Sequence, residues 1–222
     1  MEFGPEVIWS FEIAGRNIII SQTVTTTWFI MAVLIGISIL LTRKLSLVPG
    51  KKQMVAEMLV DTIYNLTETT MGKRFKNFAP YIGTLLLFIG ISNISGLFGL
   101  RPPTADLNTT MALSLMTFVL IHFMGFKSKG VGGYLKGFME PMPFLLPLNV
   151  MGELATPISL SFRLFGNIVG GLIIMTLVYD ALGNFALVVP AVLHAYFDLF
   201  AGLLQSFIFA MLTMVFVSLA AD

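Results

Sequence analysis

Two unusually long apolar segments most limit how this chain can fold. Residues 144–178 contain only two charged side chains, Glu153 and Arg163, and residues 191–221 contain only Asp198. As helices these segments would be about 52 Å and 46 Å long, whereas the hydrocarbon core of a bilayer is about 30 Å thick. Because neither segment has a charged exit, we expect both helices to cross the membrane with a steep tilt.

Three shorter apolar segments complete the predicted membrane helices. They lie at 24–41, 78–100 and 111–126, and each is close to the roughly 20 residues that a bilayer requires. The chain is 56% hydrophobic and 11% charged, whereas soluble domains carry about 25% charged residues. Cysteine is absent, which excludes disulfides and thiolate metal sites. We predict an all-α integral membrane protein with five transmembrane helices in a single domain, residues 1–222.

Two further segments are expected outside the lipid. Residues 53–72 predict an amphipathic helix that lies on the membrane surface, because three acidic residues make it a poor span. Its apolar face consists of Val55, Met58, Leu59, Ile63 and Leu66. Residues 1–20 are polar enough to lie outside the bilayer, and the apolar stretches at 7–13 and 17–20 predict a small hairpin.

The basic residues predict the orientation in the membrane. With five spans, the loops after the first and third spans lie on one side, and they hold ten of the thirteen lysines and arginines. The opposite side holds only Arg16 and Arg101. The positive-inside rule therefore places the basic loops and the 53–72 helix in the cytoplasm, with the N-terminus outside and the C-terminus inside.

The two long segments each carry one stripe of polar side chains. In the first segment the stripe covers about a third of the helix circumference, and its members are Asn149, Glu153, Thr156, Arg163 and Asn167. In the second, three polar residues fall within about 40° of one another, namely His194, Asp198 and Gln205. Lipid contact would be very costly for such stripes, so they are expected to face each other, water or a partner.

Arg163 is the most demanding of these residues because its guanidinium stays charged at any relevant pH. One interpretation is an internal salt bridge to Glu153 or Asp198 that holds the helices together. Glu153, however, lies about 15 Å away along the same helix. We therefore favour the interpretation that the counter-charge of Arg163 belongs to another chain.

Polar groups on both sides of a fixed cation suggest ion transfer. Glu153 would lie on the cytoplasmic side of Arg163, and Asp198 and His194 on the outer side. An ion could not pass the guanidinium directly and would have to be carried round it by a partner's carboxylate. The positive charge would favour the ionised carboxylate and so help it to release its ion.

Polar residues of the shorter spans have simpler interpretations. Ser92, Asn93 and Ser95 in the second span favour hydrogen bonds between helices over an ion path. His122, near the end of the third span, favours a structural, hydrogen-bonded histidine over a ligand.

Three separated motifs resemble the a subunit of F-type ATP synthases, the stator part of the membrane sector. The likeness covers about residues 20–220, with the motifs in the family's order. The motifs are Pro103-Thr-Ala-Asp106-Leu-Asn108-Thr-Thr110, Ser159-Leu-Ser-Phe-Arg163-Leu-Phe-Gly-Asn167-Ile and Gln205-Ser-Phe-Ile-Phe-Ala-Met-Leu-Thr213.

The resemblance implies a fold and a set of partners. The last two helices would lie as a tilted hairpin against a ring of c subunits, and peripheral-stalk b subunits would hold the stator in a bacterial plasma membrane. Ion flow would turn the ring and drive ATP synthesis. The chain alone would not be catalytic, and neither a cofactor, a metal nor a nucleic acid is implied.

The resemblance also implies roles for individual residues. Arg163 corresponds to the family's essential arginine facing the ring carboxylate. Together with the polar stripes, the matches predict an ion path comprising Gln205, Asn167, Asp198, His194, Asp106, Asn108, Glu153, Asn149, Thr156 and Ser159.

Two departures from the family pattern bear on the outer part of this path. Many relatives have a glutamate where this chain has Leu172, and several have a histidine where it has Asp198. We expect Asp198 to replace the missing acid. The exchange leaves the coupling ion, H⁺ or Na⁺, open.

Three other functions were weighed against this one. A secondary ion transporter is the main alternative, but five spans of unequal length contain no matching halves. A membrane hydrolase would need a Ser/His or metal-binding constellation, and His122 and His194 are expected near opposite faces. A purely structural scaffold would not need Arg163 in the middle of the membrane.

Overall fold

The chain forms one helical body preceded by a short hairpin. A computed structural model describes residues 7–13, 16–43, 45–139, 142–183 and 188–221. Strands β1 (Val7–Ile13) and β2 (Arg16–Ser21) pair antiparallel, with Ile13 opposite Arg16. The predicted hairpin is therefore confirmed, and β2 leads directly into the first helix.

Five helices are long and apolar enough to cross a membrane, which confirms the predicted class. The helices are α1 (Gln22–Thr42), α2 (Lys51–Met71), α3 (Ala79–Ile94), α4 (Leu107–Gly137), α5 (Leu146–Leu182), α6 (Val188–His194) and α7 (Gly202–Ala221). Shorter helical turns are η1 (Lys73–Phe78), η2 (Ser95–Phe98), η3 (Pro103–Ala105) and η4 (Pro143–Leu145). A π-helix, η6 (Ala195–Ala201), joins α6 to α7, so these three elements form one continuous rod.

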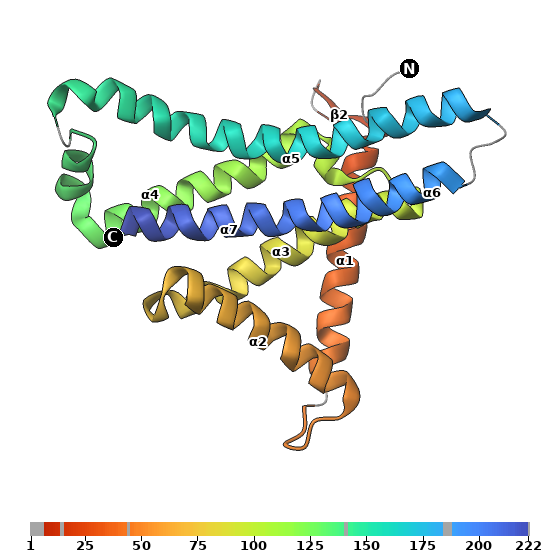
Figure 1. The fold of residues 1–222 in the computed structure, drawn as a ribbon, viewed down its shortest axis with the longest axis horizontal. Coiled ribbons are helices and arrows are strands. Elements are labelled where there is room, and N and C mark those ends of the chain that lie inside the picture. Colours follow the sequence, from red (N-terminus) through yellow and green to blue (C-terminus); the bar gives the residue numbers. More distant parts are fainter. Residues whose placement is uncertain (1–6, 14–15, 44, 140–141, 184–187, 222) are drawn as a thin grey trace.

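The two long rods lie across the direction of the first helix. Figure 1 shows α5 and the α6–α7 rod running alongside each other, with α1 crossing them at a large angle. These helices cannot all be perpendicular to one membrane plane, so the steep tilt expected from their lengths fits the arrangement. The α2 helix joins the lower end of α1 to α3, and Met71 at its end packs against α7.

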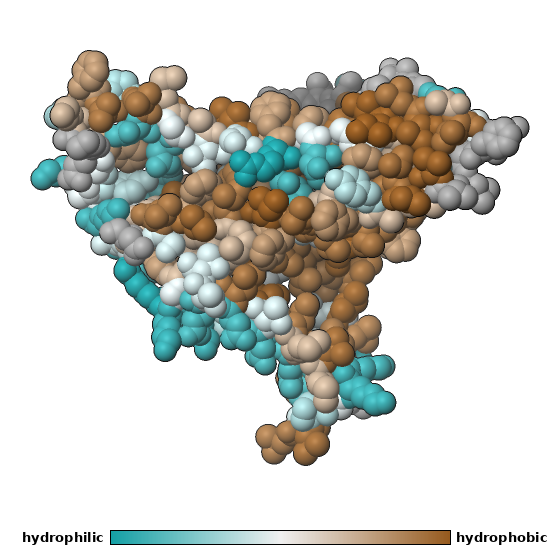
Figure 2. Space-filling view, viewed as in Figure 1, coloured by the Kyte–Doolittle hydropathy of each residue, from teal (hydrophilic) through white to brown (hydrophobic). Residues whose placement is uncertain are grey.

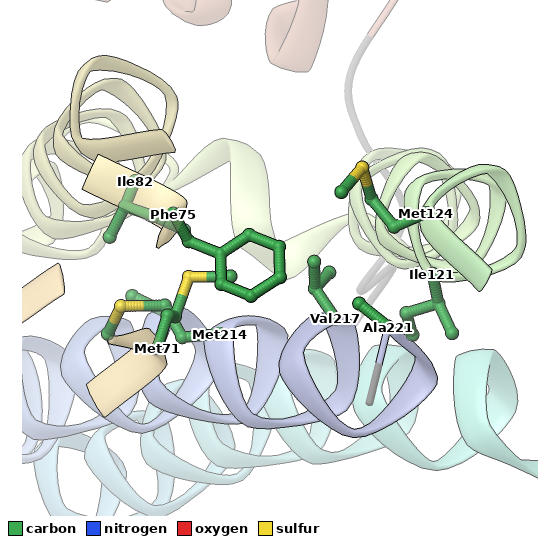
Figure 3. Close-up of a cluster of buried hydrophobic side chains, with 9 residues drawn as sticks. Met71, Phe75, Ile82, Ile121, Met124, Met214, Val217 and Ala221 are labelled. Atoms are coloured by element: carbon green, nitrogen blue, oxygen red, sulfur yellow. The ribbon is translucent and has the colours of Figure 1, made fainter. Parts of the chain in front are cut away.

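A buried apolar cluster fixes α7 at the centre of the molecule (Figure 3). Met214 and Val217 of α7 meet Phe75 of η1 and Ile82 of α3, all of them at least 95% buried. Ile121 and Met124 of α4 close the cluster from the other side. With Met71 of α2, four elements converge on α7, so its position is set by packing rather than by its loop connections.

A second cluster fixes the rotation of α5. Leu160 and Leu164 of α5 pack with Leu85 and Ile89 of α3 and with Phe209 of α7. Since residues 160 and 164 lie one turn apart on the same face, this contact defines the inner face of α5. Arg163 lies outside that face and is exposed.

The α1 and α2 helices leave most of their apolar side chains uncovered within this chain. In α1 only Thr23, Thr26 and Ile30 are buried, all in its first half. In α2 only Thr67 and Met71 are buried, so the predicted apolar face around Met58 remains exposed. Figure 2 shows largely hydrophobic surface around α1, with hydrophilic side chains along the outer edge of α2.

The structure differs from the expected boundaries in two places. Residues 127–129, expected in a glycine-rich loop, continue α4, and the backbone then turns at Gly130, whose φ of 71° suits glycine. The turn expected over 179–190 is shorter, because α5 continues to Leu182 and α6 begins at Val188. Both differences arise because helix ends follow local hydrogen bonding that hydropathy does not register.

Buried hydroxyl and amide groups tie the helices together. Asn93 donates from Nδ2 to the carbonyl of Gly202 at 2.8 Å and accepts from Thr104 Oγ1 at 2.6 Å. The interhelical role expected for Asn93 is thus confirmed. Ser95 instead bonds back to the Ser92 carbonyl. His122 has the expected structural role, because its Nδ1 bonds the Phe118 carbonyl at 2.9 Å.

Candidate functional site

The polar stripe of α5 faces a groove between α5 and α7. A cavity of about 180 Å³ is lined by Thr156, Ser159 and Arg163 of α5 and by Phe216 of α7. Thr156 and Phe216 also line a larger cavity of about 540 Å³. The two cavities share these residues and Gly152, so they form one path along the groove that ends at Arg163.

The larger cavity carries most of the polar groups of this path. Glu153 and Asn149 of α5 line it together with Lys129 and Tyr134 of α4. Asn149 donates from Nδ2 to the Phe138 carbonyl at 2.9 Å, which ties α5 to the end of α4. The cavity therefore carries one negative and one positive side chain, and it adjoins the smaller cavity that ends at Arg163.

Pro157 changes the α5 backbone beside this path. A proline at this position cannot donate to the carbonyl four residues before it, so the Glu153 carbonyl lacks its helical donor. Thr156 bonds back to the Gly152 carbonyl at 3.2 Å, which leaves its hydroxyl oxygen next to the cavity. The region thus presents acceptor oxygens of the kind that solvate a cation.

Arg163 makes no ion pair or hydrogen bond within the part of the chain that the structure describes. The two salt bridges found there join Lys76 to Glu68 and His194 to Asp198. The internal salt bridge considered for Arg163 is therefore not found among the described residues. The Arg163 residue is exposed and lies outside the face of α5 that packs on α3 and α7.

The rod formed by α6, η6 and α7 is distorted where α5 and α3 meet it. In a π-helix the backbone hydrogen bonds span five residues instead of four, and such segments often occur at functional sites. Asn167 of α5 donates to the Ala201 carbonyl at 3.5 Å, and Asn93 of α3 donates to the next carbonyl, that of Gly202. Two amides thus bond the carbonyls at the junction between η6 and α7.

Gln205 lies one turn beyond this junction. It is 7% exposed, and its Nε2 is buried without a hydrogen-bond partner among the described residues. A buried amide donor without a partner costs about 1–3 kcal/mol, so this group is available to a partner that the chain alone does not supply.

His194 and Asp198 form a hydrogen-bonded pair on the rod. His194 Nδ1 lies 2.6 Å from Asp198 Oδ2, and His194 Nε2 lies 3.1 Å from the hydroxyl of Tyr179 at the end of α5. Asp198 also lies against Gly96 of η2, where a Cβ atom would be 3.3 Å from the Asp198 Cγ. The sequence predicted that His194 and Asp198 lie on one polar stripe, whereas Tyr179 was expected in a turn.

Asp106 and Asn108 have a local structural role at the start of α4. The Asp106 carboxylate accepts a hydrogen bond from the Asn108 backbone N–H at 3.0 Å and so caps the helix. The Asn108 side chain is exposed. Neither residue makes a hydrogen bond or ion pair with Asp198 or Arg163 in the described part of the chain, so their place on an ion path remains a prediction.

Some residues could not be found from sequence patterns alone. Lys129 and Tyr134 come close to Glu153 only because the backbone turns at Gly130, and Tyr134 then packs against Gly125. The described residues also contain no group of three side chains suited to hold a metal ion. The site therefore consists of a polar groove, an exposed cation and a hydrogen-bonded triad.

Comparison with known proteins gives a consistent result. The ATP synthase A chain family matches residues 24–218. An ATP synthase subunit a described as sodium ion specific, from Propionigenium modestum, is 41% identical, with 89% of this chain and 73% of that protein covered. ATP synthase subunit a of Moorella thermoacetica is 39% identical, with 90% of each chain covered. Subunit a 2 of a Bradyrhizobium strain is 38% identical, with 90% of this chain and 89% of that protein covered.

The match covers nearly all of the helical body, including the α5 stripe and the α6–α7 rod. The match favours this family over the secondary ion transporter, which was the main alternative from the sequence. The chain therefore belongs to the ATP synthase A chain family, and it is a multi-pass membrane protein that serves as the stator a subunit of the ATP synthase complex without being catalytic alone.

Proposed function

We propose that this subunit provides two half-channels that meet at Arg163 and pass the coupling ion to and from carboxylates of a c-subunit ring. One half-channel follows the groove lined by Glu153, Thr156 and Ser159. The other begins at Tyr179, His194 and Asp198. Arg163 separates them, so an ion can change sides only on the ring.

The groove between α5 and α7 supports the first half-channel. Its two adjoining cavities, about 540 Å³ and 180 Å³, have room for several water molecules, and they narrow toward Arg163. Glu153 supplies a negative charge in the wider part, and Lys129 lies at the same cavity. The Glu153 carboxylate would attract a hydrated cation, against the opposing charge of Lys129, and the guanidinium at the end of the groove would stop it.

The junction of η6 and α7 supports the second half-channel. Asp198 is the only carboxylate on the α6–η6–α7 rod between residues 188 and 221, and it lies on the side that faces η2. The Asn167 amide and the buried Gln205 amide continue a polar line from Asp198 toward the middle of α5. We assign to Asp198 the role of the acid that is missing at Leu172.

The exposed face of α5 supports contact with a ring. Arg163 is free of partners among the described residues, and the neighbouring Phe162 and Ile158 are exposed apolar side chains. A ring of apolar helices that each carry one carboxylate would cover the apolar side chains and supply the counter-charge. A guanidinium favours the ionised form of such a carboxylate and would promote release of its ion.

The uncovered apolar side chains of α1 and α2 support contacts with lipid and with peripheral-stalk b subunits. The basic residues at both ends of α2 and after Phe126 favour a cytoplasmic location for this side in a bacterial cell, by the positive-inside rule. The end of α5 that carries Tyr179 would then face outward. Asp106 and Asn108 would lie near that outer side.

The observation that carries this proposal is an exposed arginine, without a partner among the described residues, at the end of a polar groove. The test is Arg163→Ala in the complete ATP synthase complex in proteoliposomes. We expect ion-driven ATP synthesis to fall by at least about 1,000-fold, because a fixed charge at the transfer point contributes about 4 kcal/mol or more in a low-dielectric site.

The matched control is Arg43→Ala, which removes an exposed arginine at the end of α1. It should leave synthesis near the wild-type rate. Coupled synthesis by an assembled Arg163→Ala complex at the wild-type rate would refute the assignment of Arg163.

A further inference from the structure

An apolar groove lies between α3 and α4 and shares no lining residue with the cavities beside α5. Its volume is about 480 Å³, and it is lined by Tyr81 of α3 and by α4 side chains that include Met116, Val119 and Phe123. These three α4 residues are each more than half exposed. The groove therefore presents apolar surface that this chain does not itself cover.

The length and chemistry of the groove match an acyl chain. The groove follows α4 for about 16 Å, from Ala112 to Phe123. That length is close to half of the roughly 30 Å hydrocarbon layer, which is the distance that one acyl chain spans. Apart from the Tyr81 hydroxyl, the lining side chains carry no oxygen or nitrogen atom.

Positively charged side chains lie at the end of the groove that is nearest the turn at Gly130. Lys127 follows Phe123 by one helical turn, on the face of α4 that carries Leu120. Arg74 of η1 reaches the same end of α4, because its Nη2 donates to Ser128 Oγ at 2.6 Å. Since η1 leads directly into α3, this hydrogen bond joins the two helices that form the groove.

Arg74 is held in place but keeps most of its donors available. Its guanidinium lies over the Phe75 ring, 5.3 Å from the ring centroid. Of its five N–H donors, Ser128 accepts one. The Ser128 hydroxyl in turn still has its own proton to donate. The pair therefore presents several donors together at one place on the surface.

The positive charge at this end of the groove is not neutralised within the described part of the chain. No ion pair joins Arg74 or Lys127 to a carboxylate among those residues, and Glu68 of α2 is already paired with Lys76 at 3.7 Å. Arg74 and Lys127 are both exposed. An anion that reached them would find two cations and a hydroxyl at the edge of an apolar groove.

We propose that this groove binds an anionic phospholipid, with an acyl chain between α3 and α4 and the phosphate group held by Arg74, Lys127 and Ser128. A guanidinium binds phosphate oxygens through paired hydrogen bonds, and basic pockets between membrane helices suit anionic headgroups. An apolar helix of another subunit would cover the groove but leave the two cations without an anion, whereas one phospholipid satisfies both. The inference does not depend on the half-channels and takes only the orientation proposed above, which puts the headgroup in the cytoplasmic leaflet.

A lipid bound here would support the packing of α7. Phe75, next to Arg74, is 4% exposed within the cluster that fixes α7. A phosphate group that bridges Arg74 and Lys127 would hold η1 against α4 and so keep Phe75 in that cluster.

The experiment uses the complete ATP synthase complex in phosphatidylcholine vesicles. The vesicles contain a trace of phosphatidylglycerol with a photoreactive diazirine on one acyl chain, and labelled peptides are identified by mass spectrometry after illumination. We expect label on α4 between Ala112 and Phe123. It should exceed the label from a phosphatidylcholine probe with the same acyl chain by about 25-fold, because each of the two cations contributes about fivefold to affinity for an anionic headgroup.

A pair of double variants tests the headgroup contacts. Arg74→Gln with Lys127→Gln should lower the phosphatidylglycerol label to the level of the phosphatidylcholine probe. The matched control is Arg43→Gln with Lys52→Gln, which removes two exposed basic residues from the loop after α1, on the same side of the membrane. Its label on α4 should equal that of the wild type.

A pair of single variants tests the acyl-chain contacts. Val119→Trp places a large ring in the groove and should lower the α4 label from both probes by at least about threefold, because the ring takes the space of the chain. Ile35→Trp, at an exposed position on α1, is the control and should leave the α4 label unchanged.

Three results would overturn the lipid site. Absence of label on residues 112–123 of the assembled wild-type complex would mean that another subunit covers the groove. Equal label from the two probes would mean that only ordinary surrounding lipid is present. Equal label in the two double variants would mean that Arg74 and Lys127 do not hold the headgroup.

The two probes can be compared on the wild-type complex alone, so the test stands even if a variant fails to assemble. The lipid label is also independent of ion transfer. Arg163→Ala should lose synthesis and keep the label, whereas loss of the lipid site would leave the assignment of Arg163 standing.

Discussion

The two ends of the α5–α7 hairpin present polar groups in different ways. At the end near Lys129, Glu153 and Thr156 line cavities along a groove that leads to Arg163. At the other end, Tyr179, His194 and Asp198 are already joined by short hydrogen bonds. The first arrangement suits a hydrated ion that diffuses through water, and the second suits a proton passed between side chains. The same ion would then move through water on one side of Arg163 and between hydrogen-bonded side chains on the other.

The largest expected effect outside Arg163 concerns the end that holds Tyr179, His194 and Asp198. Asp198→Asn keeps the size of the side chain but removes its negative charge, so ion-driven synthesis should fall by about 100-fold. Synthesis is measured in proteoliposomes, and assembly is checked by co-purification of the ring. Asp180→Asn, an exposed carboxylate outside the triad, is the control. Unchanged synthesis in Asp198→Asn would show that the two ends do not differ as described.

A smaller effect is expected at the groove end. Glu153→Gln removes the negative charge from the larger cavity, and the local cation concentration there should fall by about tenfold. The rate of synthesis should then become more sensitive to the ion concentration on the cytoplasmic side, which is varied in the assay. Asp61→Asn removes an exposed charge on α2 and should not alter that dependence. If Glu153→Gln behaves like this control, the groove does not collect the ion.

The smallest effect is expected from Gly96→Ala. The added methyl group would displace the Asp198 carboxylate by a few tenths of an ångström and strain its rotamer, so synthesis should fall by about threefold. Gly90→Ala on α3 is the control, because its Cβ atom would lie at an ordinary 3.5 Å from Ser206 Oγ. Equal rates in the two variants would mean that the outer half-channel tolerates movement of Asp198.

Much of the fold follows from hydropathy. Apolar length predicted all five long helices, and the amphipathic pattern predicted α2, because membrane helices satisfy their own backbone hydrogen bonds. The π-helix and the turn at Gly130 were not predicted, since both depend on packing between distant segments. Periodicity averages over such local changes in the backbone.

The site was predicted less completely than the fold. The α5 stripe and the pairing of His194 with Asp198 follow from helical spacing, because residues four apart share a face. Tyr179 meets His194 only through the register of α5 against α6, fifteen positions apart in the chain. The capping role of Asp106 has a recognisable signal, an acidic residue directly before an apolar helix.

The central claim is that the two polar regions open to opposite sides of the membrane and are separated at Arg163. Because the chain contains no cysteine, single-cysteine variants can report access without background. The measurement is modification of Ser159→Cys and Tyr179→Cys by a charged, impermeant thiol reagent, in sealed vesicles of either orientation that contain the complete complex.

We predict that Ser159→Cys, which lies in the groove beside Arg163, reacts only from the cytoplasmic side, and that Tyr179→Cys reacts only from the outer side. Modification of Ser159→Cys at equal rates from both sides would contradict the account, because the two regions would then form one continuous channel.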